Sequence, residues 1–139
     1  KGYFTSGSYT PGDFNWEWYN DLWEYDPSAN DWTQKASYDA LGRHWPVAIT
    51  IGNKAYVGTG TYRLDRAHEG IYLNDFWEYD PATDSWEQKA NVPEEGRTSA
   101  TGISIGNKGY VGLGLYYYDT RLKDWWEYDP AEDAVLGEH

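Results

Sequence analysis

One eight-residue motif occurs three times in this chain, and it restricts the possible folds more than any other feature. Its copies are residues 20–27 (NDLWEYDP), 74–81 (NDFWEYDP) and 123–130 (KDWWEYDP). The first two copies are 54 residues apart and the last two are 49 apart. Self-similarity at such a period predicts a repeat architecture, in which each repeat is one supersecondary unit.

A second motif repeats in phase with the first. Residues 51–60 (IGNKAYVGTG) return at 105–114 (IGNKGYVGLG), again 54 residues later, and residues 1–7 are a weaker third copy. The complete middle repeat predicts four short strands, which we name A to D. They are expected at 47–51, 55–60, 75–79 and 85–89, with a longer loop at 61–73.

Turn chemistry supports this division. Gly52 and Asn53 both tolerate positive φ, which suits a tight hairpin between strands A and B. Residues 80–84 begin with Asp80 and Pro81, which favour a turn between strands C and D.

Four antiparallel strands of this kind form one twisted sheet, and a single sheet cannot bury both faces. Radial stacking of such sheets buries them, as in a β-propeller. The nine tryptophans and fourteen tyrosines supply large side chains for the space between the sheets. We therefore expect an all-β chain in which the Trp of each WEYD motif, Trp32 and Trp86 pack between blades.

The motifs resemble the kelch repeat, in the variant of bacterial surface and periplasmic proteins. Tyr79 and Trp86 have the spacing of that repeat, a glycine ends strand B, and Arg97 opens the next strand A. Two departures are Thr59 within the double glycine and Val135 at the position of Trp86, which leaves the last strand D uncertain. The resemblance implies a partial kelch β-propeller of about 2.5–3 four-stranded blades.

The predicted units are residues 1–42, lacking strand A, the complete blade 43–96, and 97–139 with an uncertain last strand. Propellers close with roughly four to eight blades. We therefore expect these units to belong to a larger closed ring, completed by other blades of the same chain or by further copies. Such a piece is not expected to fold stably alone.

The net charge of −12 disfavours nucleic acid and anionic membranes as partners. No apolar run approaches the length of a membrane span, so membrane insertion is not expected.

The chain has no cysteine, and its three histidines lack zinc spacing. The acidic turns suit backbone capping better than calcium binding, and no catalytic, phosphate-binding or dinucleotide motif occurs. No catalytic residue, metal or cofactor is predicted.

The loops joining B to C and D to A lie on one face of a propeller, and all five arginines map there. Arginine and aromatic residues together are typical of binding hot spots. The predicted ligand or partner contacts are Arg43, Arg63, Arg66, Arg97, Arg121, Trp16, Trp18, Tyr62, Tyr116, Tyr117 and Tyr118. For Arg43 and Arg97 an equal alternative is a structural bond to neighbouring loops or blades.

These observations favour a non-catalytic binding module for a protein, peptide or glycan. The resemblance implies a second hypothesis, a carbohydrate-active enzyme such as a sialic acid mutarotase, whose acidic substrate would suit the arginines. A third is a purely structural assembly component. A secreted, cell-surface or periplasmic location is what the resemblance implies.

Overall fold

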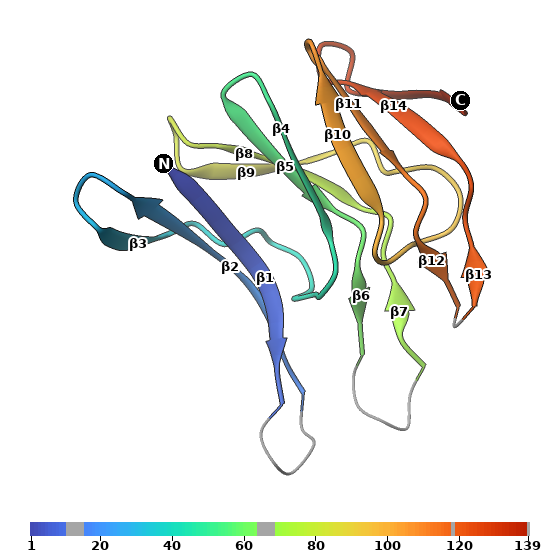
Figure 1. Cartoon of the computed structure of the whole chain (residues 1–139), viewed down its shortest axis with the longest axis horizontal. Helices are drawn as coiled ribbons and strands as arrows, with labels where there is room; N and C mark the ends of the chain where they lie inside the picture. The colour runs from blue at the N-terminus through green and yellow to red at the C-terminus, as the bar shows by residue number, and fades with distance from the viewer. Residues whose placement is uncertain (11–15, 64–68, 118, 139) are drawn as a thin grey trace.

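The computed structural model describes residues 1–10, 16–63, 69–117 and 119–138, and this part of the chain consists of β-strands, turns and loops. Three antiparallel sheets lie side by side, each rotated relative to the next (Figure 1). The chain is an all-β partial propeller, and we name its sheets blades 1 to 3. Within the described ranges there is no helix long and apolar enough to cross a membrane.

Blade 1 has three strands and blades 2 and 3 have four each. Blade 1 contains β1 (Gly2–Tyr9), β2 (Glu17–Asp26) and β3 (Asp31–Lys35). Blade 2 contains β4 (Val47–Ile51), β5 (Lys54–Gly58), β8 (Phe76–Asp80) and β9 (Ser85–Lys89). Blade 3 contains β10 (Thr101–Ile105), β11 (Lys108–Gly112), β14 (Trp125–Asp129) and β15 (Ala134–Glu138).

The four strands expected in the middle repeat are therefore present, and the last strand D also forms. Val135 pairs with Tyr128 across β14 and β15, as Trp86 pairs with Tyr79 in blade 2. A β-branched residue fits a strand position as well as an aromatic one. The substitution of valine for tryptophan therefore leaves the strand intact.

The expected loop at 61–73 is partly a β-ribbon. β6 (Thr61–Tyr62) pairs with β7 (Ile71–Tyr72), and β12 (Leu115–Tyr116) pairs with β13 (Thr120–Arg121). In blade 1 the same extension is continuous, since β1 and β2 stay paired as far as Tyr9 and Glu17, with a bulge after Thr5. The expected longer connection between strands B and C is therefore present, with a short pair of strands at its base.

Blades 2 and 3 pack through the side chains of one strand. Alternate residues of β4 are buried and lie in the core cluster of Val47, Ile49, Ile51, Tyr56 and Tyr128, among others. Alternation of this kind is the pattern of a strand with one buried face. Ile49 is 7% exposed, whereas its equivalent in blade 3, Ile103, is 46% exposed because no described strand covers that face.

The same difference appears at the tryptophans. Trp86 donates its indole N–H to the carbonyl of Ala36 in blade 1 at 2.6 Å and packs on Tyr38. Trp32, its equivalent in blade 1, is 47% exposed. The expectation that every such tryptophan packs between blades was therefore wrong for blade 1, whose outer face no described blade covers.

Each junction between blades also contains one arginine that bonds to both sheets. The backbone N–H of Arg43 donates to Tyr19, and its carbonyl accepts from Gly7, both in blade 1. Its guanidinium donates to both carboxylate oxygens of Asp75 in blade 2, at 2.5 and 2.7 Å, and to the carbonyl of Thr59.

Arg97 repeats this arrangement between blades 2 and 3. Its backbone bonds to Gly60 and Leu73, and its guanidinium donates to both oxygens of Asp124 at 2.8 and 2.6 Å. Asp124 also accepts the indole N–H of Trp126. These hydrogen bonds, that of Arg97 above all, hold the pKa of Asp124 below its ordinary value, so this buried carboxyl group is ionised at neutral pH.

Arg97→Met should lower the free energy of unfolding by about 3–5 kcal/mol, because Asp124 would be left as a buried carboxylate without its counter-charge. Arg97→Lys, which keeps the charge but loses the bidentate geometry, should cost less. The measurement is urea unfolding, with Arg121→Met on exposed β13 as the control, expected within about 0.5 kcal/mol of the wild type. A loss below about 1 kcal/mol for Arg97→Met would show that the pair does not hold the junction.

Candidate binding cleft

The ribbon ends of all three blades project from the same side of the molecule, opposite the turns that join strands A and B (Figure 1). Neighbouring ribbons contact each other through aromatic rings. Trp18 of β2 lies 5.8 Å from Tyr62 of β6, and Tyr72 of β7 lies 5.5 Å from Tyr116 of β12, between ring centroids. The predicted loop face is therefore one connected surface.

The segments that join strand D to the next strand A run directly against these ribbons. His44 and Thr61 exchange backbone hydrogen bonds, and Thr98 and Leu115 do the same one blade later. The joining segment between blades 1 and 2 approaches β2 so closely at Gly42 that only glycine fits there. A Cβ on Gly42 would lie 2.4 Å from the carbonyl oxygen of Trp18. The close approach fixes the ribbons relative to the blades.

A cleft of about 340 Å³ opens between these segments. Its walls come from the ribbons of all three blades and from the two joining segments. The lining residues are Trp16, Trp18, His44, Trp45, Thr61, Arg63, Gly70, Tyr72, Thr98 and Leu115.

Stacked rings form one wall of the cleft. Trp16 and Trp18 lie nearly parallel with centroids 5.5 Å apart, and His44 meets Trp18 edge-on at 4.7 Å. His44 in turn stacks on Trp45 at 4.1 Å. Trp45 has a positive φ of 53°, and Ser99, its equivalent one blade later, has a φ of 54°, so this backbone conformation recurs with the repeat.

Three buried polar atoms belong to residues that line the cleft. The indole nitrogens of Trp16 and Trp18 and the hydroxyl of Thr98 have no hydrogen-bond partner among the described residues. Thr98 is only 4% exposed. A buried polar atom without a partner costs about 1–3 kcal/mol, so three such atoms on residues that line one cleft are unusual in a folded chain.

Arg63 supplies positive charge to the same cleft. Burial, and then the nearby charge of Arg63, lower the pKa of His44. His44 is therefore neutral at pH 7, and the cation beside the aromatic wall is the guanidinium of Arg63. Among the described residues, the cleft thus combines aromatic faces, neutral N–H and O–H groups, and the positive charge of Arg63.

The structure brings some of the predicted contact residues together and separates others. Trp16, Trp18 and Arg63 line the cleft, and Tyr62 packs behind Trp18. Tyr116 and Tyr117 lie on the next ribbon, where Tyr117 donates to Glu69 at 2.5 Å, and Arg121 is exposed on β13. Arg66 and Tyr118 lie outside the described residues.

Arg43 and Arg97 are each 0% exposed and bonded to aspartates. Of the two roles considered for them, the structure supports the structural one. A guanidinium enclosed with its carboxylate has no free face for a ligand, so these two residues do not belong to the cleft.

Sequence reasoning placed Tyr72 among the aromatic residues of this face but missed six other lining residues: His44, Trp45, Thr61, Gly70, Thr98 and Leu115. One signal was present: His44 and Trp45 stand where the next repeat has Thr98 and Ser99. Large residues at positions that are small in the sister repeat indicate a local role beyond the scaffold. In the described part of the chain, no three histidine or carboxylate side chains are grouped so as to hold a metal ion.

No protein-family model matches this chain, and no curated protein sequence matches it. Its fold is similar to that of the solved structure of YjhT, with a TM-score of 0.71 and 18% sequence identity. The match covers 86% of this chain and 46% of YjhT, so the chain spans about half the length of that structure. Similarity at this identity concerns the fold alone.

Gly42→Ala should disturb the cleft, because the added methyl overlaps the backbone of Trp18. We expect a loss of about 1–3 kcal/mol in stability, the usual range for overpacking, and a changed near-ultraviolet circular dichroism spectrum. Gly2→Ala is the matched control, since its Cβ would meet only a Phe4 ring carbon at 3.6 Å. An unchanged spectrum for Gly42→Ala would mean that the contact does not position Trp18.

Proposed function

We propose that this chain is a non-catalytic binding module of a kelch-type propeller, and that its aromatic cleft binds a glycan. The observation that carries the proposal is a trio of buried polar atoms, Trp16 Nε1, Trp18 Nε1 and Thr98 Oγ1, which have no partner among the described residues and belong to side chains around a stacked aromatic wall. Sugar hydroxyls and ring oxygens are acceptors for such donors. The C–H faces of a sugar ring also pack well on indole rings.

The shape of the cleft favours a glycan over a protein surface. Its volume of about 340 Å³ lies within the range of small-ligand pockets. Protein interfaces instead bury about 800 Å² on each partner.

Membership of the kelch family rests on the repeated motifs, with the arginine, tyrosine and tryptophan spacings of residues 43–96. The propeller fold is compatible with that assignment. A secreted, cell-surface or periplasmic location follows from the same resemblance and is part of the proposal.

The test is binding of a panel of neutral and acidic oligosaccharides, followed by calorimetry on the best ligand. Trp18→Phe keeps an aromatic ring but removes the N–H donor, and should weaken binding roughly tenfold or more, because a polar ligand group loses its partner. Arg63→Ala should weaken acidic glycans more than neutral ones. Neither change should lower the melting temperature by more than a few degrees.

Trp32→Phe is the matched control, since Trp32 is exposed on the outer face of blade 1, away from the cleft. Its binding should equal that of the wild type. Equal effects of Trp18→Phe and Trp32→Phe would contradict the assignment of the cleft. Turnover of an acidic sugar, detected as a change in anomeric ratio, would favour the enzyme hypothesis instead.

A further inference from the structure

A histidine lies between two tryptophan rings in the aromatic cleft. The imidazole of His44 stacks on Trp45 with ring centroids 4.1 Å apart, and it meets Trp18 edge-on at 4.7 Å. Its backbone exchanges hydrogen bonds with Thr61, so the residue is held from the ribbon as well. These contacts fix the place of a titratable ring on the wall of the cleft.

The charge state of this ring is coupled to the cation of the same cleft. Burial lowers the pKa of the His44 imidazole, and the positive charge of Arg63 lowers it further. Both residues line the cleft. The imidazole is therefore neutral at pH 7 while Arg63 has no counter-charge beside it, since two neighbouring cations oppose each other.

Arg63 is the charged side chain that acts on His44 in the described part of the chain. The rings against the imidazole are tryptophans, and Thr61 bonds to its backbone, so none of these contacts titrates. Arg43 precedes it in the chain, but its guanidinium is buried and bound to Asp75. Arg63 is therefore the group through which a ligand can change the charge of His44.

Two carboxylates adjoin cleft residues in the sequence and have partners of their own. Glu17 accepts a hydrogen bond from the Tyr19 hydroxyl at 2.8 Å, and Glu69 accepts one from the Tyr117 hydroxyl at 2.5 Å. Both glutamates are exposed, so solvent and salt screen their charges. They do not serve as the counter-charge of Arg63.

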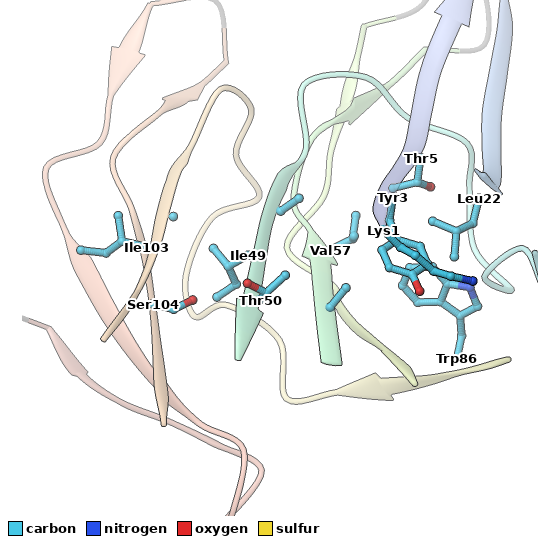
Figure 2. Close-up of a pocket in the computed structure, with 13 residues that line it drawn as sticks. Lys1, Tyr3, Thr5, Leu22, Ile49, Thr50, Val57, Trp86, Ile103 and Ser104 are labelled. Carbon is cyan, nitrogen blue, oxygen red and sulfur yellow. The ribbon is translucent and has the colours of Figure 1, made fainter. Parts of the chain in front are cut away.

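The larger pocket between blades 1 and 2 has a different chemistry (Figure 2). Its volume is about 490 Å³, and the cation among its described lining residues is Lys1, whose ammonium group bonds to Glu24 at 2.6 Å. No histidine is among those lining residues. Of these two cavities, the aromatic cleft is the one that places a histidine beside a second cation.

An anionic group bound at Arg63 removes the electrostatic penalty on His44. It offsets the charge of the guanidinium and adds a negative charge, so the imidazolium form becomes more favourable. The indole of Trp45 then contributes, because a cation over an indole face is stabilised. By linkage, protonation of His44 strengthens the binding of the anion by the same factor.

A neutral glycan has no such effect. It carries no charge to offset Arg63, and it displaces water from the cleft, which makes the imidazolium form of His44 less favourable. Its affinity should therefore not rise as the pH falls. The two classes of ligand respond to pH in different ways.

We propose that His44 makes the ligand preference of the cleft depend on pH, so that anionic glycans bind more tightly in mild acid and neutral glycans do not. This inference rests on the proposed glycan-binding function and adds its regulation. The affinity for an anion should be constant at high pH, rise as the pH falls through the pKa of His44 in the complex, and level off below that of the free chain.

The probes are D-glucose 6-sulfate and D-glucose. The sulfate ester stays ionised in mild acid, so any pH dependence of its binding comes from the protein. Calorimetry at about pH 5.5 and about pH 8, on either side of the ordinary histidine range, should show glucose 6-sulfate binding roughly three- to tenfold tighter in acid. One pKa unit between free and bound states corresponds to a factor of ten. Glucose should show no such gain.

His44→Thr is the matched variant, since it copies the next repeat. There Thr98 exchanges the same two backbone hydrogen bonds with Leu115, so threonine suits this backbone. The variant should bind glucose 6-sulfate with an affinity that no longer changes between the two pH values. A pH dependence equal to that of the wild type would show that another group is responsible and would overturn the proposal.

A second measurement needs no ligand. Arg63→Gln removes the positive charge, so the pKa of His44 should rise in the free chain, as followed by an NMR titration of the imidazole. An unchanged pKa would overturn the coupling on which the proposal depends.

The remaining outcomes separate this inference from the proposed function. Glycans of the panel that bind while glucose 6-sulfate does not bind, or changes its affinity less than about twofold with pH, would overturn the inference alone. No binding of any glycan at either pH would overturn the proposed function together with it.

Discussion

The buried arginine at each junction is the interaction on which the rest of the structure depends. Through its backbone, Arg43 bonds to blade 1, and through its guanidinium it bonds to Asp75 of blade 2. Arg97 joins blades 2 and 3 in the same way. The residues that follow, His44 and Thr98, line the aromatic cleft. The bond that holds two blades together therefore also positions the cleft.

The acidic character of the chain has a structural explanation in part. Glu78 accepts hydrogen bonds from Lys54 and Tyr56 in blade 2. Glu24 in blade 1 and Glu127 in blade 3 each bind the equivalent lysine and tyrosine in the same way. Asp84 and Asp133 accept backbone N–H groups across the junctions. These carboxylates have polar partners that recur with the repeat, so they are part of the scaffold.

Side-chain size decides what each face of a blade can accept. Gly102 and Gly109 admit the side chain of Ile49, which a Cβ at either position would meet within 2.7 Å. On the other side of the molecule, Gly42 lets the joining segment approach Trp18. Small residues at these positions allow close contact between backbones and branched side chains, which larger residues would prevent.

The sequence by itself determined the strands, the tight turns and the division into blades, because alternation, turn residues and repetition are local signals. It also indicated the face with the aromatic ribbons, and Trp16, Trp18 and Arg63 within it. Only the tertiary structure decided that Arg43 and Arg97 are buried, that Trp32 is exposed, and that His44, Trp45 and Thr98 complete the cleft. Burial and convergence depend on residues about 30 to 50 positions away, and no local pattern encodes which arginines of the chain meet an aspartate.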